Sequence, residues 1–233
     1  MVLQKSLAAI LVLLAVFSTI LGYSTKSSLD TVFENVLKTS SQAALNEGAR
    51  PFNERELRLP AVGNDGEGSL ADLRAYLARG SGKVYVRIDT ENPILNPDSQ
   101  ESVKIAVDVA KQVSNRDTSN VNIYYDIESS TQVVGGRSAT AALAIATIAL
   151  LRNETLRPGV LISATIESDD KGSLGKVNGI LAKAQAAKAG GFSELIIAPG
   201  AAEDHGASVE SQTGIEITEA ETIFDAYQLM KAK

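Results

Sequence analysis

The sequence predicts a mixed α/β domain, a mixed sheet with packed helices, preceded by an N-terminal membrane-spanning helix. Short apolar runs typical of strands alternate with longer segments whose apolar residues recur every three or four positions. An uncharged, apolar run between Lys5 and Lys26 indicates the membrane segment. The chain has 233 residues, which is enough for one sizeable domain and an accessory segment.

Composition argues against several classes of protein. The net charge is −6 and no basic stripe is interleaved with aromatic residues, so we expect no nucleic-acid partner. The absence of cysteine excludes disulfides and thiolate metal sites. Gly80–Lys83 lacks the upstream glycine and the following Ser or Thr of a phosphate loop. We therefore expect no cofactor and no bound metal.

Residues 1–26 are predicted to be a membrane anchor or a signal segment. Leu7–Leu21 is almost wholly apolar and about as long as a bilayer crossing requires, which favours contact with lipid through residues 6–25. Gly22 and Ser24 fit the small-residue pattern of a signal-peptide cleavage site, which is the alternative.

The charges beside this segment favour one orientation. The amino group and Lys5 precede it, whereas Lys26, Asp30 and Glu34 follow it. Positive charge tends to stay on the cytoplasmic side of a membrane helix. We therefore expect a single-pass protein of the cell membrane with its main domain on the external side.

Residues 27–80 are predicted to form a juxtamembrane helix and a linker. Ser28–Leu45 carries apolar residues at helical spacing, which suits a stalk or a self-association helix. Asn46–Gly68 is rich in glycine, proline and charge, as linkers and exposed loops are. Leu70–Ala78 is predicted to form a short helix before the main domain, residues 81–233.

The main domain is predicted to alternate strands and helices. Its expected strands are Val84–Asp89, Val121–Ile127, Val160–Ile166, Leu195–Ala198 and Ile215–Thr218. Its expected helices are Ser99–Ser114, Ala139–Leu151, a helix starting near Ile180, and Thr222–Lys231 with Phe224, Tyr227 and Leu229 packing inward.

Lys183 is a candidate general base. It lies in the first turn of the helix starting near Ile180, at the edge of an apolar stripe. The positive end of the helix dipole and partial desolvation both lower the pKa of a lysine there. A lysine that is neutral near pH 7 can accept a proton. The alternative is an ordinary solvated helix lysine.

Ser138 is a candidate nucleophile. It follows a glycine-rich turn and opens a helix composed almost entirely of Ala, Leu, Ile and Thr. Backbone N–H groups at Gly136, Arg137 and Ser138 could bind a developing oxyanion, and a serine hydroxyl beside a base can attack a carbonyl. A serine at this position can also serve only as a helix N-cap.

The two segments resemble the motifs of the proteolytic domain of Lon-type serine proteases. Val177–Lys183, followed by an Ala-rich helix, Gly190–Gly191 and the strand ending at Pro199, is similar to the lysine motif of that family. Gly136–Ala139 is similar to its serine motif. The resemblance covers roughly Lys83–Lys233 and is closest to archaeal-type Lon-like proteins with an N-terminal membrane segment and no ATPase module.

The resemblance implies a function and a set of roles. It implies an ATP-independent serine endopeptidase that cleaves unfolded or exposed segments of proteins with a Ser138–Lys183 dyad. Thr165 falls where the family has a threonine whose hydroxyl contacts the lysine. Relatives often form hexamers, so homo-oligomers are an expectation. Two rival functions are a non-catalytic scaffold with this fold and a protease that cuts its own linker within Asn46–Gly68.

Three positions depart from the family motifs. Arg137 stands where a small residue or proline usually precedes the serine, and Asn178 and Thr140 each replace a common glycine. Arg137 could face solvent, or could favour an acidic or carboxylate-bearing substrate.

Other polar residues have simpler interpretations. His205 is the only histidine and lies in a polar loop, so an exposed residue is expected there and not a triad base. Glu167, Asp169 and Asp170 could suggest a metal site or a carboxylate pair, but a loop position before Gly172 favours solvated side chains.

Overall fold

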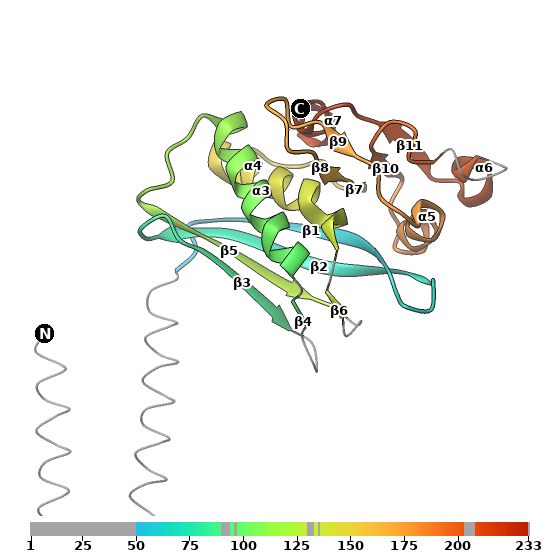
Figure 1. The fold of residues 1–233 in the computed structure, drawn as a ribbon, viewed down its shortest axis with the longest axis horizontal. Helices are drawn as coiled ribbons and strands as arrows, with labels where there is room; N and C mark the ends of the chain where they lie inside the picture. Colours follow the sequence, from blue (N-terminus) through green and yellow to red (C-terminus); the bar gives the residue numbers. More distant parts are fainter. Residues whose placement is uncertain are drawn as a thin grey trace, which may run out of the picture. The chain divides into compact units, whose positions relative to one another are not determined.

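The computed structural model describes residues 50–89, 94–95, 97–129, 133–134, 136–202 and 208–232. The compact unit formed by residues 50–233 has a mixed α/β fold with sheets and packed helices (Figure 1). The predicted membrane segment, residues 1–26, and the predicted helix Ser28–Leu45 lie outside the described residues. No helix in the described ranges is long and apolar enough to span a bilayer.

A four-stranded sheet forms one layer of the unit. Its order is β1 (Asn53–Val62), β2 (Gly68–Arg79), β5 (Val121–Glu128) and β3 (Val84–Asp89). β1 and β5 each pair antiparallel with β2, and β3 pairs parallel with β5. Alternate residues such as Leu73, Ala75 and Leu77 face the core, as expected for a sheet with one buried face.

Two predictions for the N-terminal part of this unit were wrong. The predicted linker Asn46–Gly68 contains strand β1, and the predicted helix Leu70–Ala78 lies within strand β2. The two strands pair residue by residue from Asn53↔Leu77 to Val62↔Gly68. Cross-strand pairing and burial of one face outweigh the helix propensity of the Leu and Ala residues in this segment.

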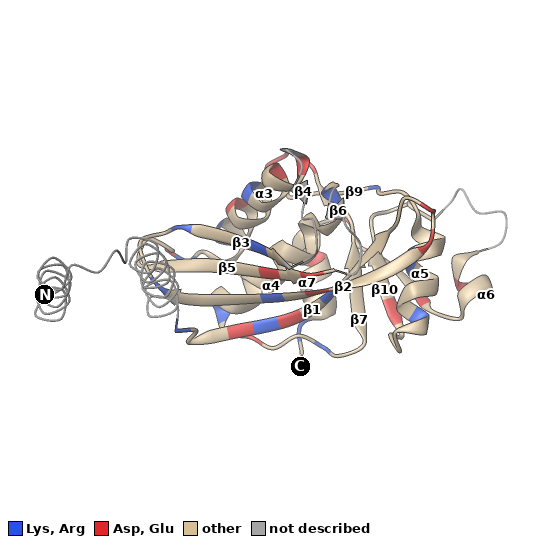
Figure 2. Cartoon of the chain, turned by 90° about the horizontal axis from the view of Figure 1, so that it is seen from below, with Lys and Arg blue, Asp and Glu red and all other residues tan. Residues whose placement is uncertain are grey.

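The opposite face of the sheet is strongly charged. In Figure 2 blue and red bands alternate across β1, β2 and β5. Arg58–Asp72 at 2.6 Å, Arg74–Glu54 at 2.6 Å and Arg87–Asp126 at 2.5 Å form ion pairs between neighbouring strands. Exposed pairs of this kind add at most about 1 kcal/mol each. These ion pairs keep this face of the sheet soluble. The stabilisation of the sheet therefore comes mainly from apolar packing on its other face.

Two helices cover the buried face of the sheet (Figure 1). α3 (Pro97–Ser114) contributes Ala106, Val107 and Ala110, whereas α4 (Thr140–Arg152) is buried on all sides over its first eleven residues. A helix that is apolar all round belongs in the centre of a core. The short parallel strands β4 (Ile94–Leu95) and β6 (Val133–Val134) precede α3 and α4.

A second, parallel sheet carries the remaining elements. Its order is β11 (Glu216–Glu219), β10 (Glu194–Ile197) and β7 (Val160–Ser163). The chain passes from β7 to β10 through the antiparallel pair β8 (Thr165–Ile166) and β9 (Leu174–Gly175), then through helix α5 (Ile180–Ala189). This connection is a β-helix-β crossover, as the sequence pattern predicted.

Helices lie on both faces of the parallel sheet. Leu161, Leu195 and Ile197 pack with α5 and α6 (Val209–Thr213), while the alternate residues pack with α4 and α7 (Ile223–Met230). The predicted inward packing of Tyr227 is confirmed, and Leu229 is partly buried. The predicted inward packing of Phe224 was wrong, because Phe224 is 47% exposed.

Candidate active site

The serine turn lies between β6 and α4. Gly136 has φ 92° and ψ 162°, a backbone conformation that a side chain disfavours. The 3₁₀ turn η1 (Arg137–Ala139) follows, and α4 begins at Thr140. Ser138 is half-buried in this turn. The first N–H groups of a helical segment lack a carbonyl partner within the helix, so this turn can offer donors to an anion.

Two hydrogen bonds attach the serine turn and the start of α4 to strand β8 and to the residue before it. The N–H of Ala141 donates to the carbonyl of Ala164 at 3.2 Å, and Arg137 Nη2 donates to the carbonyl of Ile166 at 3.4 Å. Thr165 lies between those two acceptors. The start of α4 and the strand that carries Thr165 are therefore held side by side, although they are far apart in the sequence.

The lysine helix α5 is positioned by a close approach to the β1–β2 hairpin. A Cβ added to Gly68 would lie 2.0 Å from the carbonyl oxygen of Ala182, so only glycine fits against this turn of α5. The N–H of Lys183 donates to the carbonyl of Gly179 at 3.0 Å, which closes the first turn. The predicted placement of Lys183 in the first turn of a helix is confirmed.

Lys183 lies on the buried face of α5. It shares that face with Ile180, Ala184 and Ala187, at spacings of three and four residues, and is only 3% exposed. Burial lowers the pKa of Lys183 to about 8, because a desolvated ammonium is disfavoured. The solvated alternative that applies to many helix lysines is wrong for Lys183.

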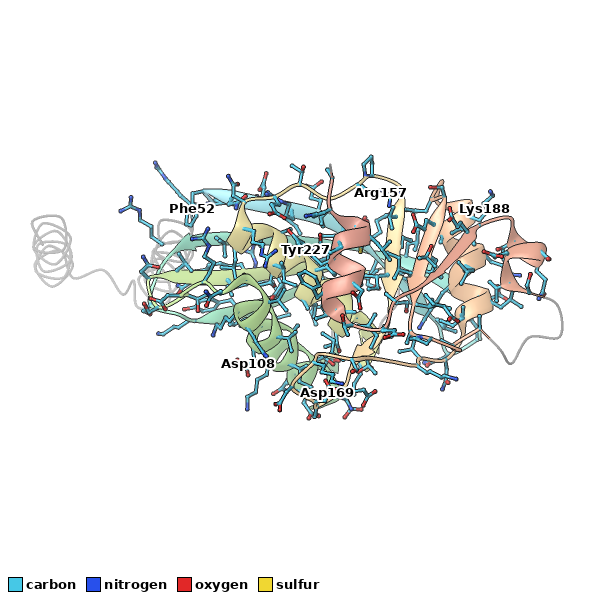
Figure 3. All side chains as sticks on the ribbon, turned by 90° about the horizontal axis from the view of Figure 1, so that it is seen from above. Phe52, Asp108, Arg157, Asp169, Lys188 and Tyr227 are labelled. Atoms are coloured by element: carbon cyan, nitrogen blue, oxygen red, sulfur yellow. The ribbon has the colours of Figure 1, made fainter. Side chains whose placement is uncertain are left out.

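Lys183 also lacks the carboxylate that usually accompanies a buried charge. Glu194, the other buried residue with an acidic or basic side chain in the described ranges, pairs with Arg157 at 3.0 Å. No ion pair forms between Lys183 and a carboxylate in the described part of the chain. Lys188, one turn later on α5 and labelled in Figure 3, is exposed and donates to the carbonyl of Gly214 at 2.7 Å.

Strand alternation directs two hydroxyl groups toward the face covered by α5. Leu161 faces α5, whereas Ile162, Ala164 and Ile166 belong to the other core. Ser163 and Thr165 occupy the positions that alternate with these residues and are 0% and 8% exposed. In a β-helix-β unit the helix begins near the carboxyl end of the first strand. The chain runs on from these hydroxyls through β8 and β9 to the first turn of α5, which carries Lys183.

Three buried side-chain atoms among the described residues have no hydrogen-bond partner. They are Arg137 Nε, Ser163 Oγ and Thr165 Oγ1. All three lie where β7 ends and β8 meets the serine turn. Buried polar groups are nearly always paired, so a cluster of unpaired ones points to a place that receives a polar ligand or a moving side chain.

The predicted dyad is not hydrogen-bonded in this structure. Ser138 Oγ and Lys183 Nζ form no hydrogen bond with each other, and Thr165 Oγ1 accepts none from the lysine. Catalytic hydrogen bonds are often long in a free enzyme and shorten when substrate binds. The roles predicted for Ser138, Lys183 and Thr165, and for the N–H groups of Gly136, Arg137 and Ser138, stay predictions.

The acidic loop has a structural explanation. Asp169 accepts the N–H groups of Lys171 at 3.1 Å and Ser173 at 3.0 Å, and hydrogen bonds from Ser173 lower its pKa. Figure 3 places Asp169 at the same edge of the molecule as Asp108 of α3. Glu167 and Asp170 are exposed, as predicted, and no described group of three or more acids and histidines could hold a metal. His205 lies outside the described residues.

A large cavity lies elsewhere in the unit. It measures about 1040 Å³ and is open to solvent between the charged sheet face and the loop that precedes β7. Ser138, Thr165 and Lys183 do not line it. Its four arginines, Arg58, Arg74, Arg87 and Arg157, are each paired with a carboxylate. Size alone does not make it the reactive site, so we place the candidate chemistry at the end of β7.

Ser163 is the residue of this site that sequence reasoning missed. Inside the apolar run of residues 160–166 a serine looks like a tolerated strand residue. The signal that could have found it is its spacing of two from Thr165, which puts both hydroxyls on one face of an extended chain.

Comparison with known proteins leaves the family undecided. No protein-family model matches this chain, and no curated protein matches it. The resemblance to Lon-type proteases therefore rests on the residues of the serine and lysine motifs.

Proposed function

We propose that this protein is an ATP-independent, Lon-like serine endopeptidase with a Ser138–Lys183 dyad. The observation that carries the proposal is Lys183, which is buried, unpaired with any described carboxylate and has its pKa lowered to about 8. A structural lysine gains nothing from such a position, whereas a general base requires it. The serine turn, whose following helix α4 is bound through Ala141 to Ala164 between β7 and β8, supplies the nucleophile and the N–H donors.

The proposed reaction begins with the neutral amine of Lys183. Its nitrogen takes the proton of Ser138 Oγ while Oγ bonds to the carbonyl carbon of the peptide. N–H groups of the turn from Gly136 to Ser138 stabilise the oxyanion of the tetrahedral intermediate. The ammonium of Lys183 then protonates the leaving amine as the C–N bond breaks, which leaves an ester on Ser138.

Hydrolysis of the ester uses the same base. Lys183, neutral again, takes a proton from water as the water oxygen attacks the ester carbonyl. The tetrahedral intermediate collapses, Ser138 Oγ leaves with the proton from Lys183, and the carboxylic acid product is released. Each turnover therefore returns Lys183 to its neutral form and consumes one water.

Arg137 is the group best placed to contact substrate beside the nucleophile. Its guanidinium lies against β8, with one bond of 3.4 Å to Ile166, a buried unpartnered Nε and no ion pair to a described carboxylate. The interpretation that Arg137 simply faces solvent loses support. A carboxylate near the scissile bond of a substrate would match this guanidinium in charge and hydrogen-bonding geometry.

The membrane anchor stays part of the proposal. Residues 6–25 would hold the chain in the cell membrane with the peptidase on the external side, acting on exposed or unfolded protein segments. Self-cleavage within Asn46–Gly68 has less support, because ten residues of that stretch form β1 and are fully paired with β2. A non-catalytic scaffold is the remaining rival.

The test is cleavage of an unfolded, casein-like protein by the purified full-length chain at pH 8 to 9 without ATP. We expect turnover by the wild type and its loss in Ser138→Ala and in Lys183→Ala. Two matched controls are Ser193→Ala and Lys104→Ala, which change an exposed serine and an exposed helix lysine. Equal cleavage by Ser138→Ala and wild type would refute the dyad, and a folded but inert wild type would favour the scaffold.

A further inference from the structure

We infer that one end of the unit formed by residues 50–233 docks on an anionic phospholipid surface. The inference rests on the membrane part of the proposed function, because the bilayer that holds residues 6–25 would supply the headgroups. This surface, the basic end, consists of the exposed residues Arg50, Phe52, Arg79, Lys83, Val84 and Arg116. Neither the Lon-like motifs nor the proposed reaction gives these residues a role.

Backbone pairing brings the residues of the basic end together. The N–H of Phe52 donates to the carbonyl of Leu77 at 3.0 Å. Leu77 and Val84 both stand opposite Ile123 in the four-stranded sheet. Phe52 and Arg116 line one cavity of about 390 Å³. The start of β1, the turn between β2 and β3, and the loop after α3 therefore form one surface.

The turn between β2 and β3 presents its side chains on a fixed backbone. Asn122 Oδ1 accepts the N–H groups of Ser81 at 2.9 Å and Lys83 at 3.0 Å. Main-chain carbonyls of residues 120 and 121 accept the N–H groups of residues 80 and 82. Because all four N–H groups are used, this turn cannot hold a phosphate through its backbone, as a phosphate loop does. A phosphate would therefore meet side chains here, above all the ammonium of Lys83.

The basic end carries positive charge in an acidic chain. The whole sequence has a net charge of −6. None of the four cationic side chains of the basic end forms an ion pair with a carboxylate of the described residues. Asp117, next to Arg116, accepts the N–H of Ser119 at 2.9 Å and its hydroxyl at 2.6 Å, within its own loop. Each Lys or Arg near an anionic membrane surface strengthens binding about fivefold.

Exposed apolar side chains accompany these charges. Phe52 is 59% exposed, Val84 is 36% exposed, and Tyr85, the next residue of β3, is 39% exposed. They are three of the five large apolar side chains that are exposed in the described part of the chain. An aromatic ring is suited to the boundary between headgroups and hydrocarbon, and cations beside it meet the phosphates. Phe52 is therefore the expected point of insertion.

The point at which the chain enters the unit favours lipid over other anionic partners. Residues 27–49 connect the predicted anchor to Arg50, which belongs to the basic end. A short tether keeps headgroups at a local concentration on the order of millimolar, so weak attraction suffices. Figure 3 shows Lys188 of α5 at the end of the unit opposite to Phe52. Docking through Phe52 would therefore leave α5, which also carries Lys183, turned away from the bilayer and open to protein substrates.

The experiment places a single tryptophan in the full-length chain. The sequence contains no tryptophan, so Phe52→Trp is a unique fluorophore, and Phe224→Trp, at an exposed position of α7, is the matched control. Each variant is reconstituted into vesicles of phosphatidylcholine with about 30% phosphatidylglycerol, or of phosphatidylcholine alone, with lipids brominated on their acyl chains as quenchers. We expect blue-shifted, quenched emission from Phe52→Trp in the anionic vesicles, and neither effect for Phe224→Trp.

The contribution of charge is measured in the Phe52→Trp background. Arg79→Gln combined with Arg116→Gln should lower the ratio of docked to undocked chains by about 20-fold. Salt at about 0.5 M should act in the same direction, because it screens exposed charges. Lys104→Gln combined with Lys171→Gln removes two exposed lysines from other parts of the surface and should leave the quenching unchanged.

Three results would overturn the inference. They are equal quenching of the two tryptophans, quenching as strong in neutral vesicles as in anionic ones, and loss of quenching when a DNA duplex is added, which would assign the surface to nucleic acid. The readout does not depend on cleavage. Failure of the proposed dyad appears separately, as equal cleavage by Ser138→Ala and wild type. Failure of the proposed anchor appears as release of the chain from neutral vesicles by alkaline carbonate.

Discussion

The backbone N–H of Ala141 donates to the carbonyl oxygen of Ala164 at 3.2 Å, which fixes the start of α4 against the connection between β7 and β8. Because Ser138 precedes α4 and Thr165 follows Ala164, this one bond holds two predicted site residues in the same region. Lys183 lies on a third element, α5, which follows β7, β8 and β9 in the chain. The chemistry expected here depends on whether Lys183 carries a proton.

The rate of peptide cleavage is expected to rise with pH through a midpoint near 8. Burial lowers the pKa of Lys183 from 10.5 to about 8, so the neutral base makes up about a tenth of the protein at pH 7 and most of it at pH 9. The measurement is kcat/KM for a short peptide between pH 6 and 10. A profile that stays flat, or that has its midpoint near 10, would show that Lys183 is not the base.

Folding stability is expected to rise between about pH 8 and pH 10.5. The folded pKa of Lys183 lies below its unfolded value, so in this window the unfolded chain binds more protons and the free energy of unfolding increases with pH. Below pH 8 the lysine is protonated in both states and the cost of burying its charge is fully present. A shift from 10.5 to about 8 corresponds to roughly 3 kcal/mol.

Lys183→Met tests the free-energy cost of burying the charge of Lys183. We expect the variant to be more stable than wild type at pH 7 by about 1–3 kcal/mol in urea unfolding, and to lose the difference at pH 11. Lys104→Met serves as the matched control, because Lys104 is an exposed lysine in α3 and its replacement should leave stability nearly unchanged. Destabilisation by Lys183→Met at pH 7 would mean that the charge is well solvated or paired.

Much of the fold could be predicted from periodicity. The helices near 99–114 and 139–151, and the strands beginning at Val84, Val121 and Val160, were confirmed to within about two residues at most of their ends. The β1–β2 hairpin could not be predicted in the same way. Its outward positions carry charges such as Glu56 and Arg58, its turn is rich in glycine, and Leu70–Ala78 has the Leu and Ala content of a helix. Only pairing between the two strands makes them a sheet.

The candidate site could be predicted in its residues but not in its contacts. Helical spacing places Lys183 on an apolar face, and the structure confirms that burial. The absence of a partner carboxylate, and the approach of α4 to Ala164, depend on which elements meet in three dimensions. Ser163 could not be distinguished from an ordinary strand residue until the partners of every buried hydroxyl were known.

Arg137→Gln is expected to change substrate preference. If the guanidinium contacts a substrate carboxylate, the wild type should cleave peptides with glutamate next to the scissile bond faster than matched glutamine peptides, and the variant should lose that preference. A charge-assisted pair of about 1.5–3 kcal/mol corresponds to roughly a tenfold to hundredfold ratio in kcat/KM. Arg116→Gln, in the exposed loop after α3, is the control. The same ratio in wild type and Arg137→Gln would leave Arg137 without a role in recognition.

Gly136→Ala is expected to slow cleavage by displacing the serine turn. An added Cβ at Gly136 has nothing within 4 Å, so space does not oppose the change. The obstacle is the backbone, because φ 92° with ψ 162° costs a residue with a Cβ about 1–3 kcal/mol. The variant can relieve this strain by rotating residues 136–138, which moves Ser138 and its N–H donors and should lower kcat by at least about tenfold.

The control for this change is Gly66→Ala in the β1–β2 turn. Gly66 also has a positive φ, 83°, and open space around the added Cβ, so it bears a comparable backbone penalty far from the serine turn in the sequence. Both variants should melt at somewhat lower temperatures, whereas only Gly136→Ala should lose turnover. The comparison therefore distinguishes a loss of stability from a loss of turnover. Equal turnover in the two variants would show that the conformation of Gly136 does not position the nucleophile.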